Sequence, residues 1–167
     1  MKAYAYMDRA PILDVNVPAG LDATLQMLQS RIGRVRVVRH YAPDLPTISA
    51  YGGELNQVWT ALIENALEAL AEMGDEEDPG ELRISVRREP EMLLVEIQDS
   101  GPGIRTELQD RIFEPFFTTK PPGQGLGLGL DNAMRIVRKH RGHIGVRSEP
   151  GNTCFLVRLP LDQLQAY

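Results

Sequence analysis

The chain has 167 residues, a length that suits one domain with a single hydrophobic core. Hydrophobic residues make up 43% and charged residues 25% of the sequence, both ordinary values for a globular protein. The net charge of −5 without a basic run argues against nucleic acid as a partner, and the lack of a long apolar run predicts no membrane contact.

The first half of the chain alternates short strands with two helices. Alternating apolar residues predict strands over Leu13 to Val17 and Arg34 to His40, and a short strand over Ile48 to Ala50. Leucines at helical spacing predict a helix over Gly20 to Ile32. The clearest helix is expected over Glu54 to Met73. Its apolar stripe consists of Leu55, Val58, Trp59, Leu62, Ala66, Ala69 and Leu70.

The second half reads as two hairpins and one further helix. We expect an antiparallel hairpin over Glu81 to Arg88 and Met92 to Asp99, a helix over Gly127 to His140, and a final hairpin over Ile144 to Arg147 and Cys154 to Leu159. This order predicts an α/β two-layer sandwich, in which about three helices cover one face of a mixed sheet.

The segment between the hairpin and the last helix is poorly patterned. Ser100 to Gln124 contains four prolines and has room only for a short helix around Thr106 to Ile112. Such a long irregular segment is usually functional or mobile, and we expect Gly101 to Gln124 to be the most mobile part of the chain. The Phe113-Glu-Pro-Phe-Phe117 run is either a loop pinned by aromatics or a lid, from which Lys120 would reach a phosphate.

Three segments carry residues suited to a nucleotide. Asn65 lies at the edge of the apolar stripe, where its amide either makes a structural hydrogen bond or binds a hard cation. Asp99 ends a buried strand before two glycines, so it either forms a turn or accepts a hydrogen bond from an exocyclic amine. The alternating glycines of Gly123 to Gly129 are either a simple turn or a phosphate cradle that opens a helix.

The cysteine and histidines point to no metal or disulfide. The single Cys154 cannot form an internal disulfide, and its alternating surroundings predict a buried strand residue in a reducing cytoplasm. His40, His140 and His143 lack the spacing of a metal site. His140 and His143 flank a helix end, where a structural role is expected.

Taken together, four segments resemble the N, G1, F and G2 boxes of the ATP-binding catalytic domain of sensor histidine kinases, within the gyrase, Hsp90, histidine kinase and MutL ATPase group. They are Asn65, Asp99-Ser-Gly-Pro-Gly103, Phe113-Glu-Pro-Phe-Phe117 and Gly123-Gln-Gly-Leu-Gly-Leu-Gly129. The run Glu54-Leu-Asn-Gln-Val-Trp59 resembles the kinase branch specifically. The resemblance covers about Leu13 to Leu159 and implies a Bergerat-type ATP-binding fold with a mobile ATP lid.

The resemblance implies ATP and Mg²⁺ as ligands. Asp99 would bind the adenine amino group, which Thr153 would also contact through water. Asn65 would hold Mg²⁺, and Lys120 would assist catalysis with it. The remaining residues implied to line the nucleotide are Glu68, Ala69, Gly101, Gly103, Ile104, Gly125, Leu126, Gly127, Leu128 and Gly129.

Two positions depart from the family pattern. Hydrolysing members carry a water-activating Glu four residues before the Asn, where this chain has Ala61. Many kinases carry Lys three residues after the Asn, where this chain has Glu68. A carboxylate there would repel a triphosphate unless a cation intervenes, and Lys120 is a candidate for that cation.

The resemblance implies that the chain donates the γ-phosphate of ATP to a histidine on a dimerisation domain, from which the phosphate passes to a response regulator. None of the three histidines has the setting of the acceptor, so we expect no autophosphorylation by the chain alone. We interpret residues 1–12 as the remnant of a preceding helix or linker, 13–160 as the ATP-binding catalytic domain and 161–167 as a tail.

Three alternatives share the same pocket. An ATP-hydrolysing clamp of the Hsp90 or MutL kind is disfavoured by Ala61. A serine kinase of the anti-sigma-factor kind would phosphorylate a protein serine instead of a histidine. A non-catalytic nucleotide-sensing module would agree with both Ala61 and Glu68.

Overall fold

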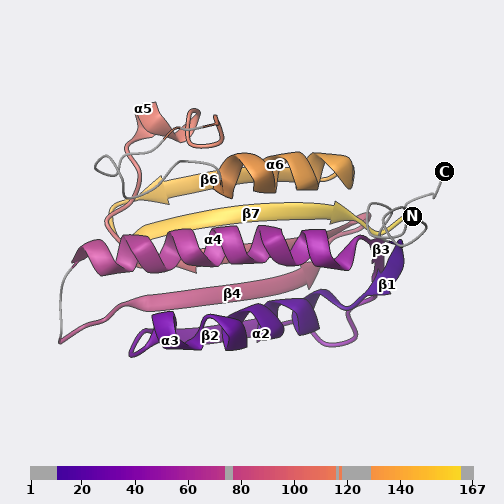
Figure 1. Ribbon diagram of the computed structural model, residues 1–167, viewed down its shortest axis with the longest axis horizontal. Helices are drawn as coiled ribbons and strands as arrows, with labels where there is room; N and C mark the ends of the chain where they lie inside the picture. The colour runs from indigo at the N-terminus through magenta and orange to yellow at the C-terminus, as the bar shows by residue number, and fades with distance from the viewer. Residues whose placement is uncertain (1–10, 74–76, 116, 118–128, 163–167) are drawn as a thin grey trace, which may run out of the picture.

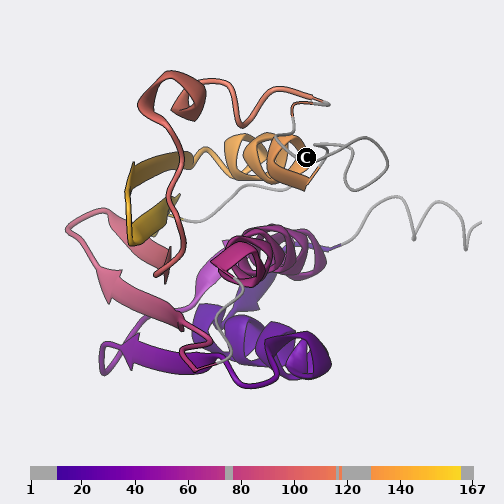
Figure 2. The same ribbon diagram turned by 90° about the vertical axis from the view of Figure 1, so that its left-hand side faces the viewer.

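A computed structural model describes residues 11–73, 77–115, 117 and 129–162. Helices lie in front of a sheet in Figure 1, and the turned view of Figure 2 shows the two layers edge-on. The elements are β1 (Leu13–Val15), α2 (Val17–Met27), α3 (Gln29–Ile32), β2 (Arg36–Tyr41), β3 (Ile48–Ala50), α4 (Gly52–Met73), β4 (Glu81–Arg88), β5 (Met92–Asp99), α5 (Thr106–Gln109), α6 (Gly129–Lys139), β6 (His143–Glu149) and β7 (Asn152–Pro160). The predicted α/β sandwich is confirmed, with three long helices and two single-turn helices among the described residues.

The main sheet is mixed, as predicted. Its five strands run in the order β2-β4-β5-β7-β6, and β1 pairs with β3 in a separate two-stranded ribbon. β2 and β4 are parallel because β3 and α4 cross over between them, whereas the other neighbours pair antiparallel. Both predicted hairpins are therefore present.

The core lies between α4 and the sheet. The predicted stripe of α4 is buried except for Ala69, which is half-buried, and Trp59 is fully inaccessible. On β5, the side chains of Leu93, Val95 and Ile97 are buried on the face that the helices cover. Because strand side chains alternate between faces, Asp99 is the next residue in this same row. The apolar row of β5 thus ends in a carboxylic acid beneath the helices.

The first helix begins earlier than predicted and is broken. The side chain of Asn16 accepts a hydrogen bond from the Ala19 N–H at 3.1 Å and caps a helix whose first turn contains Pro18. The predicted strand over Leu13 to Val17 therefore ends at Val15. The predicted helix over Gly20 to Ile32 divides at Leu28 into α2 and the short α3.

The last helix is fastened to α4 by a buried histidine. The His140 Nδ1–H donates to the Ile136 carbonyl at 2.8 Å, and Nε2 accepts from the Tyr51 N–H at 3.1 Å. The chain then leaves the helix through Arg141 at φ 59°. The structural role expected for His140 is confirmed, and Cys154 is a buried strand residue, 4% exposed, as predicted.

The irregular segment is only partly described. Its helix α5 is four residues long and ends before the predicted Ile112. Residues 116 and 118–128, which include the last part of the segment from Gly101 to Gln124, lie outside the described residues, so the expected mobility stays a prediction. In the part of the chain that is described, no helix is long and apolar enough to span a membrane.

Candidate functional site

Asp99 is a buried acid with an unused acceptor. Its side chain is 2% exposed, and Oδ1 accepts a hydrogen bond from the Gly101 N–H at 2.9 Å. Oδ2 is buried and has no hydrogen-bond partner among the described residues. Burial raises the pKa of this carboxyl to about 6, although the Gly101 hydrogen bond acts in the opposite direction. An orphaned buried oxygen of this kind is suited to a ligand that donates a hydrogen bond.

Gly101 brings the loop after β5 against α4. A Cβ atom added at this position would lie 2.7 Å from Asp99 Oδ1 and 3.2 Å from the Cβ of Ala69. Any side chain at residue 101 would therefore have to displace the acid or the helix. The two predicted pocket residues Gly101 and Ala69 are in direct contact.

The same loop is tied to the last hairpin. The Gly101 carbonyl accepts from the Gly151 N–H at 3.0 Å, and the Ile104 N–H donates to Ser148 Oγ at 2.7 Å. Ser148 Oγ also pairs with Thr153 Oγ1 at 2.7 Å. Thr153 is 3% exposed and lies opposite Asp99 in the β5–β7 pair. Sequence reasoning missed Ser148, because nothing in its local pattern separates it from a turn residue.

Gly103 makes the sharp turn between these contacts. Its φ of 90° favours glycine, and an added Cβ would lie 2.7 Å from the Glu149 carbonyl oxygen. The predicted adenine-side residues Asp99, Gly101, Gly103, Ile104 and Thr153 are therefore brought together by one loop and one hairpin.

On α4, three residues at one-turn spacing follow the same helix face. Ala61, Asn65 and Ala69 are separated by four residues each, so they extend over about 12 Å. Ala69 contacts Gly101, and an added Cβ at Gly129 would lie 3.6 Å from the Ala61 Cβ. The half-buried Asn65 thus lies between the contact with the β5 loop and the contact with the start of α6.

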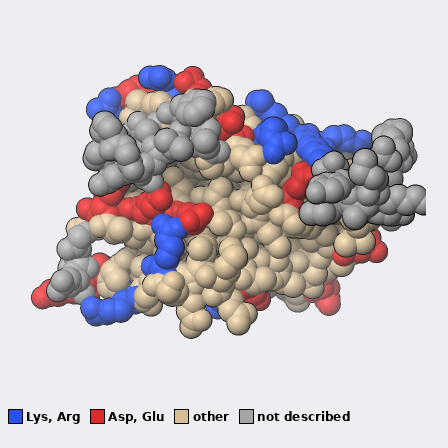
Figure 3. Space-filling view, in the orientation of Figure 1, with Lys and Arg blue, Asp and Glu red and all other residues tan. Residues whose placement is uncertain are grey.

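The outer face of α4 carries two acids paired with one arginine. Arg31 of α3 forms an ion pair with Glu64 and lies 3.8 Å from Glu68 through Nη2. In Figure 3, red and blue side chains meet on this helix-bearing face, whereas much of the surrounding surface is uncharged. Glu68, predicted to repel a triphosphate, therefore has a cation beside it that sequence reasoning missed. Arg31 is 37 residues away in sequence, and no local pattern links the two.

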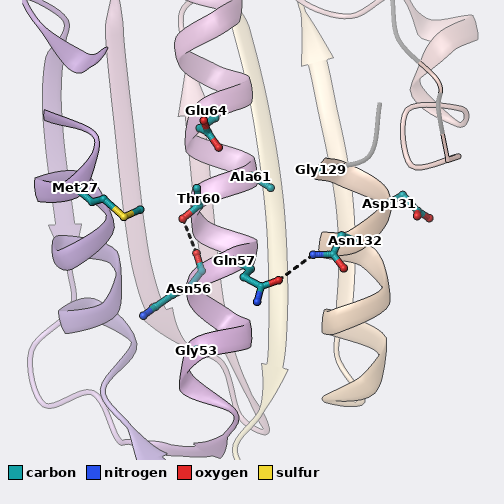
Figure 4. Close-up of a pocket in the computed structure, with 10 residues that line it drawn as sticks. All are labelled: Met27, Gly53, Asn56, Gln57, Thr60, Ala61, Glu64, Gly129, Asp131 and Asn132. Atoms are coloured by element: carbon teal, nitrogen blue, oxygen red, sulfur yellow. Dashed lines mark hydrogen bonds between the residues drawn. The ribbon is translucent and has the colours of Figure 1, made fainter. Parts of the chain in front are cut away.

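A groove between α2, α4 and α6 adjoins the contact of Ala61 with Gly129. Figure 4 shows it continuing along α4 towards Asn56, with Met27 on the α2 side. Asn132 of α6 donates to Gln57 Oε1 at 3.1 Å across the groove. The groove lies at the Ala61 end of the face formed by Ala61, Asn65 and Ala69, away from Asp99. The side chains that line the groove are mostly uncharged.

The aromatic run after α5 is partly anchored. The ring of Phe113 packs edge-on against Phe155 at 6.1 Å between centroids, and the Arg111 guanidinium lies 4.8 Å from the centre of the Phe117 ring. Phe113 and Phe117 both pack against the core, as predicted. Phe116 lies outside the described residues.

Five predicted phosphate-side residues also lie outside the described residues: Lys120, Gly125, Leu126, Gly127 and Leu128. Gly129, the last glycine of the predicted phosphate cradle, is described and begins α6. Within the described ranges, no cluster of three or more His, Cys, Asp or Glu residues could hold a metal ion. Asn65 would contribute an amide oxygen, which is a ligand of another type.

Comparison with known families and sequences gives consistent matches. Residues 52–163 match the family model described as histidine kinase-, DNA gyrase B-, and HSP90-like ATPase. The sensory histidine kinase/phosphatase NtrB of Rhizobium leguminosarum bv. phaseoli is 36% identical over 93% of this chain and 43% of its own length. NtrB of Rhizobium meliloti (strain 1021) is 35% identical over 93% of this chain and 44% of its own length. The chain therefore spans less than half the length of these relatives.

Solved structures share the fold. The catalytic domain of histidine kinase ThkA has a TM-score of 0.77 at 24% identity, covering 90% of this chain and 95% of that chain. Full-length ShkA in complex with AMPPNP has a TM-score of 0.78 at 24% identity, covering 93% of this chain and 32% of that one. ThkA in complex with response regulator protein TrrA has a TM-score of 0.75 at 23% identity, covering 90% and 42%.

We predict that the wild type loses stability as Asp99 ionises with rising pH, and that Asp99→Asn does not show this loss. The carboxyl has a pKa of about 6 in the folded chain against 3.8 when unperturbed, so the folded state holds the proton more tightly. Its favourable contribution is present below pH 4 and is lost as the pH rises through 6. The unfolding free energy of the wild type should therefore fall by about 2 kcal/mol relative to the variant between pH 4 and pH 7.

Chemical denaturation at both pH values measures this difference. Asp110→Asn, at an exposed position, is the control and should show no such change. If the difference in unfolding free energy between wild type and Asp99→Asn is the same at both pH values, the pKa of Asp99 is not raised in the folded chain.

Proposed function

The chain belongs to the histidine kinase-, DNA gyrase B- and HSP90-like ATPase family, and we propose that it is the ATP-binding catalytic domain of a sensor histidine kinase. The predicted resemblance is thus confirmed at the level of the family. In this proposal the domain binds Mg·ATP and donates the γ-phosphate to a histidine on a dimerisation domain. The phosphate then passes to a response regulator. The complex of ThkA with the response regulator protein TrrA supports a response regulator as one partner.

The observation that carries the adenine assignment is the unpartnered Oδ2 of Asp99. An exocyclic amine can donate to this oxygen, and the lack of a side chain at Gly101 leaves room beside it. The amine would favour the ionised carboxylate, because a hydrogen bond to the charged form stabilises it. Ile104 and Thr153, fixed through Ser148, would complete this end of the site.

The phosphate end would lie along α4 towards Gly129. Asn65 would contribute an amide oxygen to Mg²⁺, which when bound supplies charge neutralisation for phosphoryl transfer. The start of α6 presents backbone N–H groups at the positive end of a helix dipole. Lys120 and residues 125–128 keep their proposed phosphate-binding roles.

The acceptor histidine belongs to a partner in this proposal. His140 is buried and uses both ring nitrogens in hydrogen bonds, so it cannot present a nucleophile. The groove beside Ala61 and Gly129 is open to solvent, and in this proposal a separate chain segment would approach the γ-phosphate through it. Transfer would then depend on positioning and charge neutralisation more than on covalent chemistry by this domain.

Hydrolysis is less well supported than transfer. The side chain at residue 61 is a methyl group that packs near Gly129, so no carboxylate activates water from that position. The charge of Glu68 favours a non-catalytic nucleotide sensor, but Arg31 lies beside that carboxylate and reduces its repulsion of a triphosphate. A kinase that phosphorylates a protein serine remains as an alternative, and an experiment must distinguish it from a histidine kinase.

We predict that Asp99→Asn lowers ATP affinity about tenfold, because the amide loses an ionised acceptor and adds a donor facing the adenine amine. Isothermal titration calorimetry of wild type, Asp99→Asn and the exposed control Asp110→Asn measures this effect. Unchanged affinity in Asp99→Asn would show that adenine binds elsewhere.

We predict that Asn65→Ala removes the Mg²⁺ dependence of ATP binding while adenosine binding stays unchanged. The physical reason is the loss of the only oxygen ligand that the proposal assigns to the metal. Titrations with and without Mg²⁺ measure it, and Asn56→Ala on the same helix is the matched control. If the variant keeps the wild-type response to Mg²⁺, Asn65 is not a ligand.

We predict that the chain alone acquires no label from γ-labelled ATP but labels a separately supplied histidine-bearing dimerisation domain. The reaction should be slow, because separating the domains removes the effective concentration that a linker provides. The expected label is acid-labile and base-stable, as for phosphohistidine. Label on this chain would contradict the proposal, and acid-stable label on a partner serine would support the serine-kinase alternative.

A further inference from the structure

Arg31 links α3 to the part of α4 that carries Asn65. One nitrogen of its guanidinium pairs with Glu64, and Nη2 lies 3.8 Å from Glu68 Oε1. The two glutamates are four residues apart and therefore one helical turn apart. The planar fork of arginine can reach two carboxylates at once, whereas the single ammonium of lysine contacts two less readily.

Both glutamates adjoin the residue proposed to bind Mg²⁺. Glu64 directly precedes Asn65 in sequence. Glu68 is three residues after Asn65, which places the Cβ atoms of Asn65 and Glu68 about 5–6 Å apart on the helix surface. Two unneutralised carboxylates at these positions would oppose a triphosphate electrostatically. The arginine that contacts both would reduce this opposition.

The backbone of Arg31 is held by the core. Leu28, 7% exposed, joins α2 to α3, and its carbonyl accepts from the Arg31 N–H at 2.9 Å. Gly33 ends the turn at φ 52°, a conformation that favours glycine. The guanidinium is therefore presented to α4 by an anchored turn and not by a free loop.

The ion pairs themselves contribute little to folding. The side chains of Arg31, Glu64 and Glu68 are 42%, 38% and 37% exposed, and exposed pairs of this kind have small effects on stability. Removing Arg31 should therefore change the local charge of the site without unfolding the domain. This separates an electrostatic role from a structural one.

We propose that Arg31 is a positioning residue for the nucleotide's phosphates, because it neutralises Glu64 and Glu68 beside Asn65 and so permits a magnesium triphosphate to approach α4. The proposal rests on the proposed ATP-binding function. Arg31 does not itself touch the nucleotide in this role. Its effect should scale with the charge on the ligand, so it should be large for ATP and absent for adenosine.

The test compares Mg·ATP and adenosine affinities of wild type, Arg31→Ala and Arg39→Ala by calorimetry at low salt. Arg39 is a matched control, because it also pairs with a carboxylate, Asp22 at 3.0 Å, at similar exposure but from β2. Arg31→Ala should weaken ATP binding about three- to tenfold, and raised salt should shrink the difference. Adenosine affinity and the unfolding midpoint should match the wild type.

Two rescue variants distinguish charge from shape. Adding Glu64→Gln and Glu68→Gln to Arg31→Ala should restore ATP affinity, because the carboxylates that need neutralising are gone. Arg31→Lys keeps the charge but contacts two carboxylates less readily, so its ATP affinity should lie between those of Arg31→Ala and wild type. A loss of affinity caused by disturbed packing would not be restored by the two glutamine substitutions.

Each outcome decides the inference. ATP affinity equal in wild type and Arg31→Ala would overturn it while leaving the proposed function intact. An equal loss for ATP and adenosine, or failure of the rescue, would overturn it in favour of a structural role. If wild type binds adenosine and ATP no better than background, the proposed function fails and this inference fails with it.

Discussion

An acid held in an apolar row is the constraint on which the site depends. Asp99 continues the row of Leu93, Val95 and Ile97 on β5, so the alternation that builds the core also carries a carboxyl group into it. One oxygen accepts a hydrogen bond from the Gly101 N–H, and the other has no partner in the part of the chain that the structure describes. Burial therefore raises the pKa of the Asp99 carboxyl. The chain without ligand is less stable for it, but the buried oxygen is available to a ligand that donates a hydrogen bond.

The surroundings of Asp99 are built to hold this arrangement. The loop after β5 cannot relax away from the acid, because the β6–β7 hairpin binds it through Gly151 and Ser148. On the other side it meets Ala69, where small residues allow close approach of helix and loop. The acid is thus fixed between a sheet, a hairpin and a helix, all of which belong to the core.

The helix α4 organises the rest of the site along one face. Contacts at Ala69 and Ala61 fix the β5 loop and the start of α6 about two turns apart, with Asn65 between them. His140 fastens the far end of α6 to the residue before α4, so the two helices are joined at both ends of their contact. On the outer face of α4, Arg31 pairs with Glu64 and Glu68, the two acids close to Asn65 in sequence.

The layers, both hairpins, the buried stripe of α4 and the grouping of Asp99 with its glycines could all be predicted from sequence, because periodicity and turn residues act locally. It missed the start of α2 at Val17, since the weak strand pattern concealed the Asn16 cap and Pro18. Three features depend on long-range packing: Arg31 faces Glu68, Ser148 holds Thr153, and Oδ2 of Asp99 lacks a partner among the described residues. The physical reason is that a pattern specifies which face of an element is buried, whereas the atoms it meets come from distant segments that packing brings together.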